Sequence, residues 1–245
     1  MSYISIKNLS KEYKGKKVLE NINLTIKKGQ FVSIVGPYGS GKTTILKVIA
    51  GLINDYSGSI SVNNKPPAEL RRERKVGYAF QKATLLPWRN VLDNVALPLE
   101  IVGKSDKASA LKLLSLVGME ELASKSISEL SGGMQQLVAI LRSLVLEPDV
   151  LLLDEPFSSI DEFSKDKLHE QLLEIHSLSH KTTIMVTHSL QEAVYLSDVV
   201  IVLSKNPARV KYILEPKLKN RSIDAKYSKE VLSHIQTLRK ELQIT

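Results

Sequence analysis

The sequence predicts an α/β protein with a core of mixed sheet and helices, an N-terminal antiparallel β subdomain and an inserted α-helical subdomain. First, a glycine-rich loop joins an apolar β-branched run to an amphipathic segment, a pattern typical of a strand, a loop and a helix. Second, another apolar run ends in two carboxylates. Third, the spacing of apolar residues changes from two to near 3.6 over residues 91–146, which indicates helices.

The composition limits the class of protein. The 245 residues carry a formal net charge of +8 and contain no cysteine. This length suits one α/β domain with an insertion, or two small domains. The lack of cysteine excludes disulfides and thiolate metal sites and fits a reducing compartment. We see no signal-peptide segment and no apolar run near the roughly 18 residues that cross a bilayer, so we expect a chain that is soluble on its own.

The positive charge gathers in two places, Arg71–Lys75 and the segment from Lys205 to Lys240. Such clusters can attract an anionic membrane surface or nucleic acid, or can simply form a solvated surface. The clusters lack interleaved aromatic residues, and the chain carries no nucleic-acid-binding module. We therefore expect no nucleic-acid partner.

The N-terminal part alternates short apolar runs with turns. These runs predict strands over Tyr3–Ile6, Val18–Ile26 and Phe31–Val35. The last run is apolar throughout, as expected for a strand that is covered on both faces. Tyr13 is expected between the first two strands, where packing against the sheet is one interpretation of this aromatic residue.

A phosphate-binding loop follows the third strand. The pattern G-x-x-x-x-G-K-T spans Gly36–Thr43 and opens a helix at Lys42. Glycines allow the backbone N–H groups to wrap an anion, and the helix N-terminus adds partial positive charge. Lys42 would contact the β and γ phosphates, and Thr43 would ligate Mg²⁺. The predicted nucleoside triphosphate site contains Gly36, Pro37, Tyr38, Gly39, Ser40, Gly41, Lys42, Thr43 and Thr44.

The next part of the chain predicts the insertion. Gly58–Val62 and Val76–Phe80 are expected as strands that flank the basic turn, and Gln81 follows directly. We expect a single domain over residues 1–245, in which residues 82–147 form the helical subdomain. Residues 1–81 and 148–245 would form the nucleotide-binding core, with a C-terminal helix over 228–242.

A second helix N-terminus that could bind an anion lies inside the insertion. Ser131 is a good N-cap, and Gly132 and Gly133 leave the following backbone N–H groups unshielded. An ordinary serine-capped helix is the alternative, although it would not need two glycines.

Polar residues follow two further predicted core strands. Asp154 and Glu155 come after an apolar run, at the edge where α/β sheets bind ligands. Asp154 suits the Mg²⁺ shell, and Glu155 suits a general base that activates water. His188 follows the strand predicted for residues 182–187 and could hold the γ-phosphate, or could be a helix cap or a packed loop residue. Helix is predicted for residues 165–178 and strands for 198–203 and 209–214.

Taken together, these motifs resemble an ATP-binding cassette ATPase over nearly the whole chain. The order and approximate spacing match for Gly36–Thr43, Gln81, Leu130–Gln136, Val150–Glu155, Ser159–Asp161 and His188. The resemblance implies that Tyr13 stacks on adenine and that Gln81 contacts Mg²⁺ and water. It also implies a homodimer in which Ser131, Gly132 and Gly133 of one subunit close over ATP on the phosphate loop of the other. Asp161 would belong to the loop that crosses the dimer interface.

Four residues differ from the family's usual pattern, and two motifs resemble one particular group within the family. Tyr38, Leu137, Leu141 and Ile160 differ from the family's usual residues. Leu85–Trp88 and the Met-Gln-Gln signature look like importer ATPases of the nitrate, sulfonate, taurine and thiamine-precursor group. This implies uptake of a small solute, with transmembrane permease subunits, an extracytoplasmic solute-binding protein and a cytoplasmic location at the inner face of the membrane.

Three other functions remain open from the sequence. One is the ATPase of an exporter or a lipoprotein-extraction complex. Another is a soluble cassette ATPase that acts on nucleic acid or ribosomes, although such proteins usually carry tandem cassettes or long insertions. The third is a nucleotide-gated regulator without turnover, which the presence of both Glu155 and His188 disfavours.

Overall fold

The computed structural model describes residues 2–104, 106–205 and 207–243. The strands are β1 (Ser2–Tyr13), β2 (Lys16–Lys27), β3 (Phe31–Val35), β4 (Ser57–Val62), β5 (Val76–Ala79), β6 (Val150–Asp154), β7 (Thr182–Val186), β8 (Val199–Leu203) and β9 (Val210–Leu214). The α-helices are α1 (Lys42–Ile49), α2 (Pro67–Arg72), α3 (Val91–Ile101), α4 (Ala108–Leu116), α5 (Gly132–Leu144), α6 (Glu162–Ser179), α7 (Leu190–Leu196) and α8 (Lys229–Gln243). Short 3₁₀ helices are η1 (Glu120–Leu122), η2 (Ile127–Glu129) and η3 (Asp224–Tyr227).

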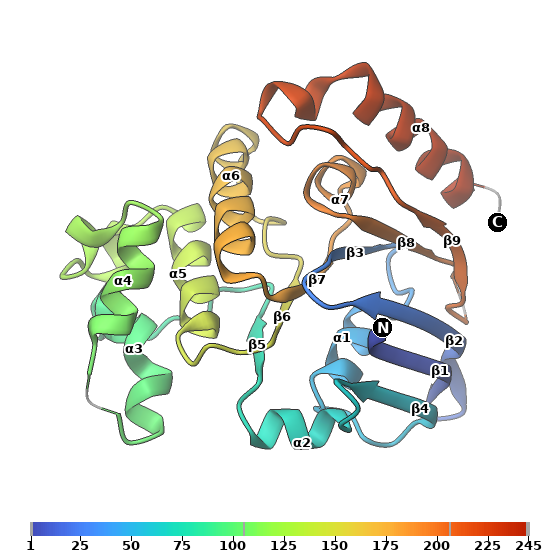
Figure 1. Ribbon diagram of the computed structural model, residues 1–245, viewed down its shortest axis with the longest axis horizontal. Coiled ribbons are helices and arrows are strands. Elements are labelled where there is room, and N and C mark those ends of the chain that lie inside the picture. Colours follow the sequence, from blue (N-terminus) through green and yellow to red (C-terminus); the bar gives the residue numbers. More distant parts are fainter. Residues whose placement is uncertain (1, 105, 206, 244–245) are drawn as a thin grey trace.

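Two sheets organise the molecule (Figure 1). The larger has the order β5-β6-β7-β3-β8-β9, in which β9 alone runs antiparallel to its neighbour. The smaller is antiparallel, with the order β2-β1-β4. The predicted fold class is therefore confirmed. The carboxyl ends of β6, β7 and β3 lie side by side, so the segments that follow these three strands meet at one edge of the sheet.

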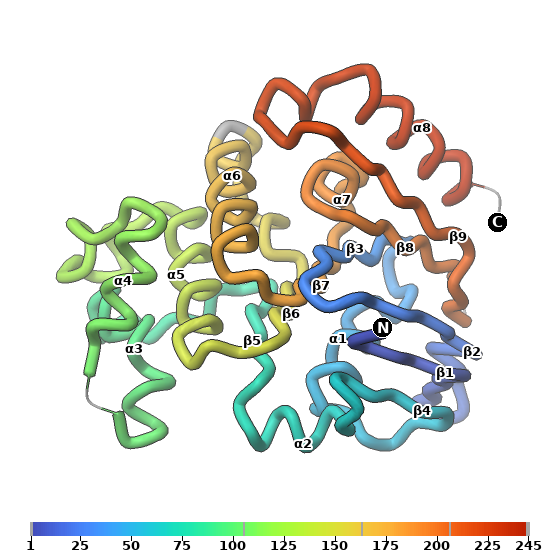
Figure 2. Tube along the Cα trace, in the orientation of Figure 1, coloured from blue at the N-terminus to red at the C-terminus, as the bar shows by residue number. Residues whose placement is uncertain are grey.

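The central strands are apolar on both faces because different cores cover them. In β6, Val150 and Leu152 pack with α1 and the smaller sheet. Leu151 and Leu153 point to the opposite face, into a core shared with α3, α5 and α6. A third core joins α7 and α8 to β8 and β9. Figure 2 shows α8 running along the outer side of β9.

The helices α3, α4 and α5 gather at one end of the molecule, away from the smaller sheet (Figure 1). They lie within residues 82–147, the segment predicted to be the helical subdomain. Leu137 and Leu141, two residues that depart from the family's usual pattern, are buried in the core of this end. Their apolar side chains pack α5 against its neighbours, so their role here is structural.

Two local predictions were wrong, and one predicted helix is confirmed with an earlier start. Tyr13 does not lie between the first two strands, because β1 continues to it and pairs Tyr13 with Lys16. Part of the basic turn is the helix α2, which begins with Pro67 at its first position and buries Leu70. α6 begins before residue 165, because the Asp161 side chain caps it by accepting from the Ser164 N–H at 3.0 Å.

None of the helices in the described part of the chain combines the length and the hydropathy that a membrane span requires.

Candidate nucleotide site

The phosphate loop joins β3 to α1 and curls around the Lys42 side chain. Lys42 is only 5% exposed, and its Nζ donates to the carbonyl oxygens of Gly36 and Pro37, each at 3.0 Å. Burial lowers the pKa of Lys42, whereas the nearby charges of Glu155 and Asp154 act in the opposite direction. The loop therefore places one positive charge inside a turn built mainly of backbone.

Two glycines of this loop are required by space or conformation. Gly41 has a φ of 79°, and a Cβ there would lie 2.8 Å from Leu19 Cδ2. A Cβ on Gly36 would lie 2.9 Å from Ser40 Oγ and 3.0 Å from the carbonyl oxygen of Leu203. The Ser40 hydroxyl is buried and has no hydrogen-bond partner among the described residues. An unsatisfied buried hydroxyl within the loop fits a site that holds a polar ligand.

The two carboxylates beside the loop have different partners. Asp154, at the end of β6, accepts from Thr43 Oγ1 at 2.9 Å and from the Tyr78 hydroxyl at 3.0 Å. Burial and the charge of Asp154 both raise the pKa of Tyr78, so this phenol stays protonated and donates. Thr43 and Asp154 thus place two oxygens together, the ligand type that Mg²⁺ prefers.

Glu155 lies between Gln81 and His188. Its Oε2 accepts from Gln81 Nε2 at 3.1 Å, and its Oε1 lies 2.5 Å from His188 Nε2. The backbone of Glu155 is left-handed, with a φ of 49°, which costs about 1–2 kcal/mol for an L-residue. Its N–H donates to the Val186 carbonyl at 2.9 Å, so the end of β7 holds this turn in place.

A cavity of about 420 Å³ opens over these groups. Tyr13 and Val18 line one part of it, and the Tyr38 ring stacks on His188 with centroids 5.9 Å apart. The lining residues are Tyr13, Val18, Tyr38, Gly39, Ser40, Gly41, Lys42, Thr43, Thr44, Gln81, Glu155 and His188. The structure therefore brings most of the predicted site residues into one cavity.

Seven of the predicted site residues are not among those that line this cavity: Gly36, Pro37, Ser131, Gly132, Gly133, Asp154 and Asp161. Ser131 caps α5 by accepting from the Met134 N–H at 3.3 Å, and Asp161 caps α6. Gly133 is buried, and a Cβ there would lie 2.9 Å from Leu168 Cδ1. Close packing of α5 on α6 is thus one reason for a glycine at residue 133. The predicted role of Gly132 and Gly133 in leaving backbone N–H groups unshielded is a separate reason.

Sequence reasoning missed two residues of the site. Val18 lies on β2 and reaches the cavity only because the smaller sheet packs next to the phosphate loop. Tyr78 reaches Asp154 because β5 pairs with β6 in a register that aligns Tyr78 with Leu152. Neither the packing of the smaller sheet next to the phosphate loop nor the pairing of β5 with β6 has a local sequence signal that would have identified these residues.

Comparison with known proteins agrees with this geometry. The family model described as "ABC transporter" matches residues 19–158, which include the phosphate loop, the serine-capped helix α5 and both carboxylates. The chain belongs to the ABC transporter family. As a member of this family of ABC ATPases, it binds and hydrolyses ATP.

Several relatives of this ABC protein share most of its length. The aliphatic sulfonates import ATP-binding protein SsuB of Bacillus cereus is 39% identical over 219 residues, which cover 88% of this chain and 86% of the relative. The taurine import ATP-binding protein TauB of Yersinia pestis is 40% identical over 210 residues, with 84% and 82% covered.

Solved ABC structures share the fold. The dimeric post-hydrolysis state of the ATP-binding cassette MJ0796 bound to ADP and Pi has a TM-score of 0.74 and 33% identity, and covers 86% of this chain and 98% of that chain. CbiO1 from Clostridium perfringens, part of the ABC transporter complex cbiONQ, has a TM-score of 0.80 and 28% identity. It covers 96% of this chain and 95% of that chain.

Proposed function

We propose that this chain is the ATP-hydrolysing subunit of an importer that takes up a small sulfonate-like solute. The observation that carries this assignment is the similarity to relatives named for import of aliphatic sulfonates and of taurine, at about 40% identity over 84–88% of the chain. The charge and the cavity of the nucleotide site bear only on ATP as the energy source and say nothing about the solute. The solute class therefore rests on the relatives.

In the proposed site, this chain's residues hold the triphosphate and a water molecule. The Lys42 ammonium would bind the β and γ phosphates in place of the loop carbonyls that it now contacts. Thr43, Asp154 and Gln81 would hold Mg²⁺, which would supply neutralisation of phosphate charge. Glu155 would accept a proton from the attacking water, and His188 would bind the γ-phosphate. The proximity of Gln81 and His188 to Glu155 supports these roles.

Tyr13 is the residue proposed to stack on the base. It lines the cavity, is 44% exposed, and has the Lys11 Nζ 4.4 Å from its ring centroid. Replacing Tyr13 with alanine is expected to weaken ATP binding by about 1–3 kcal/mol, the usual effect of losing one base–aromatic stack. Isothermal titration with a nonhydrolysable ATP analogue measures this loss. Tyr13→Phe, which keeps the ring, should bind as the wild type does. Unchanged affinity in Tyr13→Ala would favour simple packing against the sheet.

The proposed assembly is a head-to-tail homodimer. Ser131, Gly132 and Gly133 lie outside the cavity that contains Lys42, so a second copy would be needed to bring this helix start to the nucleotide. Asp161 would lie in the loop that crosses the interface. The dimeric cassettes among the structural neighbours support this arrangement.

The remaining partners follow from the importer assignment. We propose that separate permease subunits bind the ATPase at the inner face of the cell membrane. An extracytoplasmic solute-binding protein would deliver the solute, and nucleic acid has no role. The exporter and the non-transport ATPase remain alternatives, which the import names of the relatives disfavour.

A growth and uptake experiment tests the importer. Cells that lack this chain are expected to lose uptake of taurine or short alkanesulfonates, and to lose growth on them as the sole sulfur source, while growth on sulfate stays normal. The wild-type chain should restore growth. Unimpaired uptake of every sulfonate tested would contradict the proposed solute class, and increased sensitivity to an exported compound would favour the exporter.

A further inference from the structure

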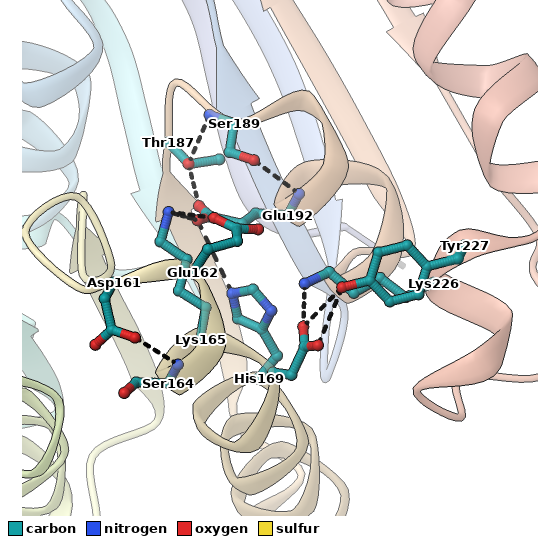
Figure 3. A network of polar contacts seen from close by, with 11 residues as sticks. Asp161, Glu162, Ser164, Lys165, His169, Thr187, Ser189, Glu192, Lys226 and Tyr227 are labelled. Carbon is teal, nitrogen blue, oxygen red and sulfur yellow. Dashed lines mark hydrogen bonds and ion pairs between the residues drawn. The ribbon is translucent and has the colours of Figure 1, made fainter.

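A polar cluster lies between α6 and α7 and includes Thr187 and Ser189, the two chain neighbours of His188 (Figure 3). Its centre is Glu192 on α7, which is 5% exposed. Thr187 lies on one side of this carboxylate, and two residues of α6 lie on the other. We define the cluster as Lys165, His169, Thr187, Ser189 and Glu192.

Glu192 is tied to both chain neighbours of His188. The Thr187 hydroxyl accepts from the Ser189 N–H at 3.0 Å. Its single hydrogen is then directed to Glu192 Oε2, to which it makes a short hydrogen bond. The Ser189 hydroxyl in turn accepts from the Glu192 N–H at 3.2 Å. The Glu192 carboxylate thus contacts Thr187, and the Glu192 backbone N–H contacts Ser189, the two chain neighbours of His188.

Lys165 is a cation beside the Glu192 carboxyl group. Burial raises the pKa of Glu192, and the Thr187 hydrogen bond and the charge of Lys165 offset this only in part. Lys165 Nζ lies 3.7 Å from Glu192 Oε1 and is shared with the exposed Glu162 at 3.3 Å. Lys226, which is buried nearby, is paired with Asp166 at 2.5 Å.

His169 does not serve as the counter-charge. Burial lowers its pKa to about 3, so it is neutral, and neither ring nitrogen has a hydrogen-bond partner among the described residues. At 3.9 Å from Glu192 Oε1, it makes no ion pair in this state. Its ring instead packs edge-on against Phe157, with centroids 4.7 Å apart.

The contact between Lys165 and Glu192 connects the start of α6 to the segment that carries His188. Lys165 lies one helical turn after Asp161, and its N–H donates to the Asp161 carbonyl at 3.2 Å. We infer that Glu192 is a positioning residue, which Lys165 holds in place and which sets through Thr187 the direction of the His188 side chain. The cluster thereby links the start of α6 to the γ-phosphate site. This inference rests on the proposed role of His188.

Thr187→Val tests the link with little change in side-chain volume. The purified full chain with this substitution is expected to show a kcat for ATP about tenfold lower, as when a hydrogen bond behind a reacting group is lost. The KM for ATP should change less than about twofold, because no group that contacts the nucleotide is removed. Thr187→Ser keeps the hydroxyl and should restore most of the kcat.

A matched control lies at the start of β7, the strand that ends just before Thr187. Thr182 is also buried, and its hydroxyl accepts from the Gly29 N–H at 3.0 Å. Thr182→Val should lower the midpoint of thermal unfolding but keep the kcat. If Thr187→Val does not fold, Lys165→Met serves as the second variant, with Lys165→Arg as its conservative rescue. The same split between kcat and KM is expected for Lys165→Met.

Three outcomes would overturn the inference: a wild-type kcat in Thr187→Val or in a folded Lys165→Met, equal losses in the valine and serine variants, or a kcat loss of the same size in Thr182→Val. His188→Ala separates this failure from that of the proposed function. A wild-type kcat in His188→Ala would contradict the role of His188 itself. A low kcat in His188→Ala with wild-type rates in the cluster variants would contradict only the positioning link.

Discussion

Replacing Lys42 with alanine is expected to weaken ATP binding at least about 100-fold, because a buried charge that would face two phosphates is lost. The structure shows this ammonium held inside the phosphate loop by the carbonyl oxygens of Gly36 and Pro37. Equilibrium binding of a fluorescent ATP analogue measures the effect directly. Turnover should fall with binding, since the same contact is required in the transition state.

Lys47 provides the matched control for this substitution. It lies in the last turn of the same helix and is exposed. Lys47→Ala removes an equal charge and a similar length of side chain, so its ATP affinity should remain that of the wild type. Tight ATP binding by a folded Lys42→Ala would show that the phosphates lie elsewhere.

Glu155→Gln is expected to separate ATP binding from hydrolysis. The amide keeps the shape of the side chain but cannot accept the proton of the attacking water, so kcat should fall at least about 100-fold. ATP affinity should be retained, and the variant should accumulate as a dimer with ATP and Mg²⁺, because the nucleotide remains intact between the subunits. Light scattering coupled to gel filtration measures the dimer, and phosphate release measures the rate.

An exposed glutamate on α6 controls for the loss of charge. Glu174, which is exposed and does not line the cavity, is replaced with glutamine; this variant should keep the wild-type rate and remain a monomer under conditions in which the wild type does. Normal hydrolysis by Glu155→Gln would assign the proton transfer to another group. A variant that stays monomeric with bound ATP would contradict the proposed dimer.

The residues that could be predicted from the sequence are those with a local signal. An apolar strand leads to each of Lys42, Asp154 and His188. The carboxyl ends of parallel strands lie at the same edge of a sheet, so these residues meet there whatever the exact bounds of each strand. Ser131 was predicted as a cap because capping depends on neighbouring residues alone. The fold class followed from the same periodic patterns.

The features that could not be predicted depend on contacts between distant segments. Tyr78 meets Asp154 only through the pairing of β5 with β6. The close approach of Leu168, on another helix, is one reason for a glycine at residue 133. The partnership of Glu192 with Lys165 joins two helices whose separate sequences show only ordinary charged surfaces. Residue spacing within one element carries no information about any of these contacts.

The alternation along β6 has a consequence for how this protein can vary. Val150 and Leu152 belong to one core, and Leu151 and Leu153 belong to another, while Asp154 and Glu155 follow at the end of the strand. Cores packed at crystal-like density pass on volume changes instead of absorbing them. A mutation that enlarges or shrinks a side chain in either core is therefore expected to shift Asp154 and Glu155.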